Sequence, residues 1–230
     1  MKEANVKYRI TIVKDGPYIV SGSVPISEKV IVPVGNEYEY RPGRKLPQAQ
    51  TYALCRCGRS KNPPFCDGAH TISGFRGVET ASRKPYFERA EKQEGPGIDL
   101  YDDNRCAFAR FCHRKDSTAW NLTDDSDTSE NREEAIRAAY ECPAGRLTAV
   151  GKDGTVYEPE YEPEIEILQD PEREVSAGIF VKGGIPIQSA DGTQYETRNR
   201  VVLCRCGASR NKPFCDAAHV VIGYMDKQKQ

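Results

Sequence analysis

One pattern of residues occurs twice in this chain, and it constrains the fold more than any other feature. Residues 55–70 read CRCGRSKNPPFCDGAH, and residues 204–219 read CRCGASRNKPFCDAAH. The two copies agree at 12 of 16 positions without gaps, and each has the spacing Cys-x-Cys-x8-Cys-x3-His. Thiolates and imidazoles are the ligands that proteins offer to transition metals. The repeat therefore predicts two metal sites.

The spacing within each copy suggests how the ligands are presented. Cys55 and Cys57 point to the same face if they lie on an extended segment. Pro64 is predicted to begin a short helix, which would place Cys66 and His70, four residues apart, on one side. Each copy would then offer two thiolates from one arm and a thiolate plus an imidazole from the other. The second copy repeats the set with Cys204, Cys206, Cys215 and His219.

This pattern resembles the CDGSH iron–sulfur domains, the mitoNEET-like proteins. Both copies also have the serine, proline and aspartate of that signature, at Ser60, Pro64, Asp67, Ser209, Pro213 and Asp216. The second copy departs from the signature in Ala217, where the signature has glycine. The resemblance implies a [2Fe–2S] cluster in each copy, with two cysteines on the inner iron and a cysteine and a histidine on the outer iron. Structural zinc is the alternative.

Composition argues against several other classes of function. The chain of 230 residues has 33 Lys and Arg against 34 Asp and Glu, so charge favours neither nucleic acid nor an anionic membrane as a partner. No apolar run approaches the roughly 18 residues that would span a membrane. The N-terminal sequence has no signal or transit pattern. We therefore expect a cytoplasmic protein, in which the nine cysteines are metal ligands rather than disulfides.

The repeated unit is longer than the motif itself. Strands are predicted at residues 8–13, 18–24, 29–34 and 50–54, and a similar series between residues 179 and 203 leads into the second motif. A Gly-aromatic pair after each histidine predicts a closing strand. In single-copy members of the family, two chains pair through a strand-swapped layer. We therefore expect a monomer whose two units pair internally about a pseudo-twofold axis; two independent units are the alternative.

The interval between the motifs contains a second kind of site. The segment Cys106-x5-Cys112, a helix and Cys142-Pro143 resemble half of a bacterial-type ferredoxin of the divergent single-cluster kind. Asn131 is predicted to begin the helix, because Glu134 follows three residues later as in a capping box.

One residue of this interval departs from the ferredoxin pattern. Ala109 stands where a [4Fe–4S] ferredoxin has a cysteine, and alanine cannot bind metal. We therefore predict a [3Fe–4S] cluster held by Cys106, Cys112 and Cys142. The alternatives are a [4Fe–4S] cluster with water or His113 on the fourth iron, and three ordinary buried thiols.

These features predict an α+β protein in three parts. Residues 1–95 form the first CDGSH-type unit, residues 96–158 a ferredoxin-like domain, and residues 159–230 an acidic connector and the second CDGSH-type unit. The acidic stretch 158–174 is expected to be a solvated connector, or else a docking site for a basic partner.

The predicted function is that of a carrier rather than a catalyst. It transfers electrons or clusters to protein redox partners or cluster acceptors, and its His-ligated clusters are proton-sensitive. The alternatives are a zinc-binding structural or interaction module and the electron-carrier component of a larger oxidoreductase.

Overall fold

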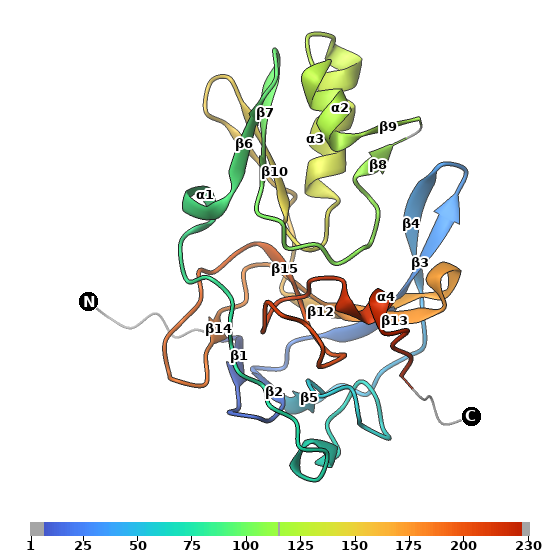
Figure 1. Ribbon diagram of the computed structural model, residues 1–230, viewed down its shortest axis with the longest axis vertical. Coiled ribbons are helices and arrows are strands. Elements are labelled where there is room, and N and C mark those ends of the chain that lie inside the picture. Colours follow the sequence, from blue (N-terminus) through green and yellow to red (C-terminus); the bar gives the residue numbers. More distant parts are fainter. Residues whose placement is uncertain (1–6, 115, 227–230) are drawn as a thin grey trace.

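The computed structural model describes residues 7–114 and 116–226. Within them the chain forms three sheets of four or five strands, one two-stranded ribbon and a few short helices (Figure 1). The fold is therefore α+β, as the sequence predicts. Two sheets carry the two cysteine-rich motifs, and the third belongs to the interval between them.

The first sheet leads into the first motif. In β1 the buried side chains are Ile10 and Ile12, and in β2 they are Tyr18 and Val20, so every second residue faces the core. This alternation is typical of strands with one buried face. The strand order is β14 (Ile187–Gln188), β1 (Arg9–Ile12), β2 (Tyr18–Ser21) and β5 (Thr51–Leu54).

The second sheet leads into the second motif and is more deeply buried. All of β15 and nearly all of β12 and β13 are buried, because this sheet lies between the first sheet and the inserted domain. The strand order is β15 (Arg200–Leu203), β13 (Val175–Lys182), β12 (Glu164–Asp170), β3 (Ile26–Val34) and β4 (Glu37–Pro42).

Each of these sheets includes a strand from the other half of the chain. Strand β14 lies parallel to β1, with Ile187 opposite Ile10, and β3 lies parallel to β12, with Ile26 opposite Ile165. The hydroxyl of the fully buried Tyr18 also crosses between the halves, since it donates to the carbonyl oxygen of Cys204 at 2.8 Å. One apolar core is shared by both halves as a result.

The inserted segment builds its own sheet with helices on one face, at the top of Figure 1. Alanines of α3 pack on Ile98, Leu100 and Leu147 of the sheet. The strand order is β11 (Val156–Tyr157), β10 (Leu147–Gly151), β7 (Ile98–Asp102) and β6 (Glu91–Glu94). The other elements are α1 (Tyr86–Arg89), β8 (His113–Arg114), β9 (Ser117–Thr118), α2 (Ala119–Asp124) and α3 (Ser129–Tyr140).

Helix α3 begins before the residue that the sequence predicted. Its N-cap is Thr128, whose hydroxyl accepts from the amide of Asn131 at 3.3 Å. Asn131 is therefore the third helical residue and not the cap. The prediction that this helix begins at Asn131 was wrong because the Thr128 hydroxyl satisfies the free amide that a capping residue must satisfy.

The acidic stretch also differs from the predicted solvated connector. Residues 164–170 of it form β12, and the 3-10 turn η2 (Pro171–Arg173) follows. Buried Glu166 lies 2.8 Å from Nζ of Lys182, and buried Asp170 binds Arg110. These carboxylates tolerate burial because each has a cationic partner.

Candidate metal sites

In both motifs the predicted ligands lie in two close pairs. The first two Sγ atoms are 3.6 Å apart in each copy, and the third Sγ lies 3.4 Å or 3.5 Å from Nδ1 of the histidine. Two sulfur ligands of one tetrahedral metal, each about 2.3 Å from it, are separated by about 3.7 Å. The pairs are Cys55–Cys57, Cys66–His70, Cys204–Cys206 and Cys215–His219.

The pairs do not converge on a single point. Across residues 7–114 and 116–226, no three His, Cys, Asp or Glu side chains are grouped to hold one metal ion. A structural zinc ion needs four ligands around one centre. Two pairs that each suit one metal are the donor set expected for a cluster of two irons, each with two protein ligands.

The non-ligand residues of the motif hold the loop in shape. In the first copy the Ser60 hydroxyl donates to the carbonyl of Phe65 at 2.6 Å, and the Asp67 carboxylate accepts from the amides of Lys61 and Ala69 at 2.8 and 3.0 Å. The second copy has the same three bonds, within 0.1 Å, from Ser209 and Asp216. The shared serine and aspartate are therefore explained by loop geometry.

The helical turn after the motif is shorter than predicted. It is η1 (Ala69–Thr71) in the first copy and α4 (Ala218–Val221) in the second, so Pro64 does not begin a helix. The chain turns through a left-handed residue just before each helix, at Gly68 with φ 86° and at Ala217 with φ 65°. Ala217 thus adopts the backbone that the signature glycine provides, at a cost of about 1–2 kcal/mol.

The closing strand predicted after each histidine is not found in the part of the chain that the structure describes. Within the described residues no strand is assigned to residues 72–77 or 222–226. The aromatic side chains there have another role. The Phe75 ring faces the guanidinium of Arg56 at 5.4 Å, and the Tyr224 ring faces that of Arg205 at 5.6 Å. Both arginines lie between two ligand cysteines and are almost fully buried.

One thiol of each inner pair is predisposed to ionise. The thiol of Cys57 and the backbone N–H groups of Ser60 and Gly58 lower the pKa of Cys55 to about 5. The corresponding groups lower the pKa of Cys204 to about 7. Hydrogen bonds to a thiolate stabilise its negative charge, and the thiolate is the form that binds metal. Burial disfavours the charged form of an imidazole, and it lowers the pKa of His219 to about 4.

The two motifs touch each other at matched positions. A Cβ atom on Gly58 would lie 2.4 Å from the carbonyl oxygen of Cys206, and one on Gly207 would lie 2.7 Å from that of Cys57. Both glycines have positive φ, 71° and 81°. The two candidate sites are therefore in direct backbone contact.

In the middle domain the three cysteines line one small cavity of about 20 Å³. The loop between Cys106 and Cys112 curls through left-handed residues at Phe108 and Arg110, with φ 58° and 67°. The amide of Phe108 donates to Sγ of Cys106 at 3.3 Å. Curled loops that turn their N–H groups inward bind anions, including iron–sulfur clusters. Three thiols on such a loop are the kind of donor set that iron–sulfur clusters use in proteins.

Ala109 and His113 lie at different depths of this site. Ala109 lines the small cavity and packs with Ile31 and Phe111 in a buried apolar group. His113 is exposed and lines a wider opening of about 590 Å³, which Cys106 and Cys112 also line.

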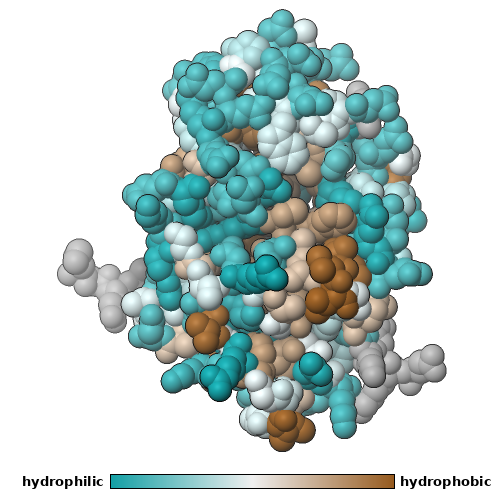
Figure 2. Space-filling model, viewed as in Figure 1, coloured by the Kyte–Doolittle hydropathy of each residue, from teal (hydrophilic) through white to brown (hydrophobic). Residues whose placement is uncertain are grey.

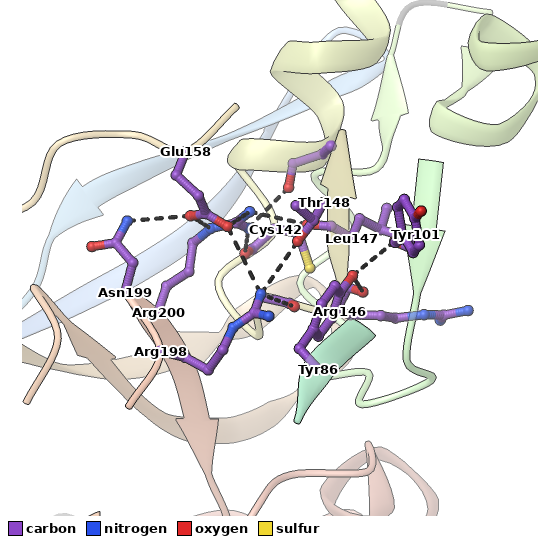
Figure 3. Close-up of polar contacts among 12 residues, drawn as sticks. Tyr86, Tyr101, Cys142, Arg146, Leu147, Thr148, Glu158, Arg198, Asn199 and Arg200 are labelled. Carbon is purple, nitrogen blue, oxygen red and sulfur yellow. Dashed lines mark hydrogen bonds and ion pairs between the residues drawn. The ribbon is translucent and has the colours of Figure 1, made fainter. Parts of the chain in front are cut away.

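The sequence reading missed two arginines near the third cysteine, and one of them, Arg200, binds its backbone (Figure 3). Arg200 donates to the carbonyls of Cys142 and Ala139 and binds Glu158 through two hydrogen bonds of 2.8 and 3.0 Å. Arg198 donates to the carbonyl of Gly145 at 3.2 Å. The sequence signal was weak: two arginines at alternate positions before a strand share a face. Burial raises the pKa of the Cys142 thiol, and the charge of Arg200 opposes that rise.

Comparison with known families agrees with this geometry. Residues 15–71 and 177–220 match the family model described as "Iron-binding zinc finger CDGSH type", and residues 93–152 match "Divergent 4Fe-4S mono-cluster". Over 26 residues, 11% of this chain, the sequence is 62% identical to "CDGSH iron-sulfur domain-containing protein 3, mitochondrial" of Mus musculus. That stretch covers 19% of the mouse protein. No solved structure matches the chain.

These matches define an iron–sulfur protein. More particularly, the chain is a CDGSH iron–sulfur domain protein in which two CDGSH-type domains flank a divergent 4Fe–4S mono-cluster domain. Among the described residues, no helix has the length and apolar character needed to cross a bilayer.

Proposed function

We propose that this protein carries single electrons through three iron–sulfur clusters held in one chain. The proposed ligands are the eight Cys and His residues of the two motifs, with a [2Fe–2S] cluster in each, and Cys106, Cys112 and Cys142, with a [3Fe–4S] cluster. When bound, such clusters supply one-electron redox chemistry.

The contiguity of the three sites is the observation that supports this proposal. The two motifs meet at Gly58 and Cys206. Cys142 of the middle site is partly buried and packs against the buried apolar cluster that contains Cys215 of the second motif and Ala107. A row of adjacent redox sites in a water-poor interior suits electron transfer within the chain.

The chain's own residues would set the redox properties of these sites. A neutral imidazole in place of a thiolate removes negative charge from a cluster and raises its reduction potential. His70 and His219 would do this at the outer irons. At the middle site, the buried cation Arg200 would act in the same direction.

Histidine ligation would also couple these clusters to protons. A proton and a metal compete for the same nitrogen lone pair, so acid should favour release of the imidazole. Cluster transfer to an acceptor protein is the second candidate function. It is favoured by the first site, where Cys66 and His70 are only partly buried.

The proposal also covers how the two CDGSH-type units of the chain are arranged. Strand exchange between the two halves and the matched glycine contacts support an internal pair of CDGSH-type units, 1–95 and 159–230, related by a pseudo-twofold axis. Residues 96–158 would be the ferredoxin-like insertion. We propose a monomer that meets protein redox partners in a reducing compartment such as the cytoplasm, without nucleic acid or membrane.

Metal analysis tests the proposal directly. Anaerobically purified protein should contain about seven iron atoms per chain, with acid-labile sulfide, and should absorb visible light. A colourless protein with stoichiometric zinc would favour the structural zinc module instead. An electron-carrier component of a larger oxidoreductase would also contain iron but would co-purify with a catalytic subunit.

A further inference from the structure

The two CDGSH-type sites share their internal hydrogen bonds but differ in what covers their outer ligands. In the second site Cys215 and His219 are buried, with 3% and 2% of their surfaces exposed. In the first site Cys66 and His70 are only partly buried. The motifs themselves are nearly identical, so the difference arises from the surrounding chain.

The loop of the middle domain that follows Cys106 lies against the second site. Ala107 packs in the same buried cluster as Cys215 and Phe180. The guanidinium of Arg105 lies 4.0 Å from the ring centroid of Phe214, the residue before Cys215. The inserted domain therefore supplies one wall of the second site.

A buried ion pair fixes this loop to the second unit. Arg110 donates to both carboxylate oxygens of Asp170, at 2.6 and 3.0 Å, and their side chains are 6% and 1% exposed. Two-point guanidinium–carboxylate pairs hold a defined geometry, and removing one partner of a buried pair is strongly destabilising. The loop after Cys106 is therefore held against the second site by a buried ion pair as well as by apolar packing.

The linker between the first motif and the middle domain also covers the second motif. The amides of Thr80 and Ala81 both donate to the carbonyl of Lys212 at 2.9 Å, and the Thr80 hydroxyl donates to that of Arg210 at 2.7 Å. Ser209, beneath this linker, is 2% exposed. Its counterpart in the first motif is partly exposed.

The first site has a lighter cover. Its matched loop carbonyl, at Pro63, accepts from Arg44 at 2.7 Å, and the Arg44 side chain is 34% exposed. In Figure 1 the first motif lies at the end of the molecule opposite to the inserted domain.

Cys215 and His219 of the second site are buried although helix α4, which carries His219, is partly exposed to solvent. Helix α4 turns His219 inward and Val221, 88% exposed, outward, and Figure 2 shows an apolar patch where α4 lies. Solvent approaches this site from the inner side, where Cys206 lines a cavity of about 690 Å³ with Gly58 and Lys61.

We propose that the inserted domain makes the two CDGSH-type sites unequal: the first exchanges its metal group through Cys66 and His70, and the second retains its own. This inference rests on the proposed function, because both sites must hold iron. In the exchange, donor groups of the acceptor would take the place first of the Cys66 thiolate and the His70 imidazole, and then of the Cys55 and Cys57 thiolates. The four side chains would be left without the metal group, and no electron would be transferred.

The test measures which thiol is released first. The iron-loaded chain is treated anaerobically with an iron chelator and iodoacetamide, and alkylation is followed by mass spectrometry, since Cys66 and Cys215 fall on separate tryptic peptides. Cys66 should be alkylated at least about tenfold faster than Cys215, because the covered site must first open locally. Equal rates, or faster reaction at Cys215, would overturn the proposal.

Matched variants identify the cover. Arg105→Met removes the cation over Phe214 and should speed alkylation of Cys215 while leaving Cys66 unchanged. Arg44→Met, at the first site, should leave Cys215 unchanged. An unaltered Cys215 rate in folded Arg105→Met would overturn the role of the inserted domain. The wild-type comparison decides the proposal even if that variant does not fold, and a chain without iron would contradict the proposed function instead.

Discussion

Arg200 donates a hydrogen bond from its guanidinium to the backbone carbonyl of Cys142, although 58 residues separate them and they belong to different parts of the fold (Figure 3). The Arg200 side chain is fully buried, and Glu158 balances its charge. The second CDGSH-type unit therefore places a positive charge directly behind a proposed ligand of the middle site.

Replacing Arg200 tests this electrostatic contact. In Arg200→Met, reduction of the middle cluster should become harder, because the positive charge that stabilises the added electron is lost. Unfolding free energy should also fall, by about 1–3 kcal/mol for each buried carbonyl that loses its donor, as at Ala139 and Leu147. Redox titration followed by EPR and denaturant unfolding measure the two effects.

Arg198→Met is the matched control for this variant. Arg198 stacks on the Tyr86 ring at 3.7 Å and bonds to Gly145 and Thr148, not to Cys142. Arg198→Met should lower the unfolding free energy without an equal shift in the reduction potential of the middle cluster. Equal shifts in both variants would mean that the Arg200 charge has no special relation to the middle site.

A glycine pair tests the contact between the two motifs. Gly58→Ala would place a Cβ atom 2.4 Å from the Cys206 carbonyl, so the two backbones must separate. Gly35→Ala is the control, because Gly35 has a similar φ of 59° but nothing within 4 Å of its Cβ position. In both variants the left-handed backbone costs about 1–2 kcal/mol of unfolding free energy. Gly58→Ala should lose appreciably more unfolding free energy than Gly35→Ala, and only Gly58→Ala should also lose cluster occupancy.

Local patterns in the sequence predicted the local features of this fold. The strands before the first motif were predicted from β-rich runs such as residues 18–24, and in the structure Tyr18 and Val20 of that run are buried on one face of β2. The Cys-x-Cys pairs lie 3.6 Å apart, close enough to share a metal.

Features that depend on distant partners were missed. Asp170 looked like part of a solvated acidic run, but Arg110, 60 residues away, allows it to be buried. Strand β14 falls within the predicted series between residues 179 and 203, but periodicity could not reveal that it pairs with β1, near the other end of the chain. Arg200 was missed for the same reason, since the groups that bind it lie in the inserted domain.

The middle cluster should be distinguishable from the other two by EPR. An oxidised [3Fe–4S] cluster is paramagnetic, whereas oxidised [2Fe–2S] clusters are EPR-silent. Cys142→Ala should abolish the signal of the as-isolated protein and keep the visible absorbance of the outer clusters. A signal that survives in this variant, or none in undamaged wild-type protein, contradicts the [3Fe–4S] assignment.

The tail after the second motif contains a buried ion pair with a defined pH dependence. Burial alone would raise the pKa of Asp226. The charge of Arg205 and hydrogen bonds from Arg205, Ser176 and Gln169 lower this pKa by more than burial raises it, so the net shift is downward. A carboxyl group with a lowered pKa stabilises the fold above its unfolded-state pKa of about 4, and this contribution is lost as the pH falls through the folded-state pKa.

Asp226→Asn should therefore lose about 3–5 kcal/mol of unfolding free energy at pH 7, because buried Arg205 is left without its counter-charge. The difference from wild type should shrink as the pH falls below about 4. Denaturant unfolding at several pH values measures it. Asp191→Asn, in an exposed turn, is the control and should change little; a pH-independent difference for Asp226→Asn would show that packing and not charge is lost.

Histidine ligation predicts that acid releases the two [2Fe–2S] clusters. Protonation of an imidazole competes with its bond to iron, whereas a thiolate in that position would hold the iron more firmly. Visible absorbance is followed after an acid step in wild type, His70→Cys, His219→Cys and the double variant. His70→Cys should slow the faster part of the decay, because His70 is the partly exposed histidine, and His219→Cys should slow the slower part.

The double variant separates protonation of histidine from other effects of acid. It should slow both parts of the decay and leave the middle cluster unaffected, because no histidine is proposed as a ligand there. The EPR signal of the middle cluster is the internal control for general unfolding in acid. If the double variant lost its [2Fe–2S] absorbance as fast as wild type while that signal persisted, protonation of the histidines would not be the trigger, and the proton-coupled part of the proposed function would be wrong.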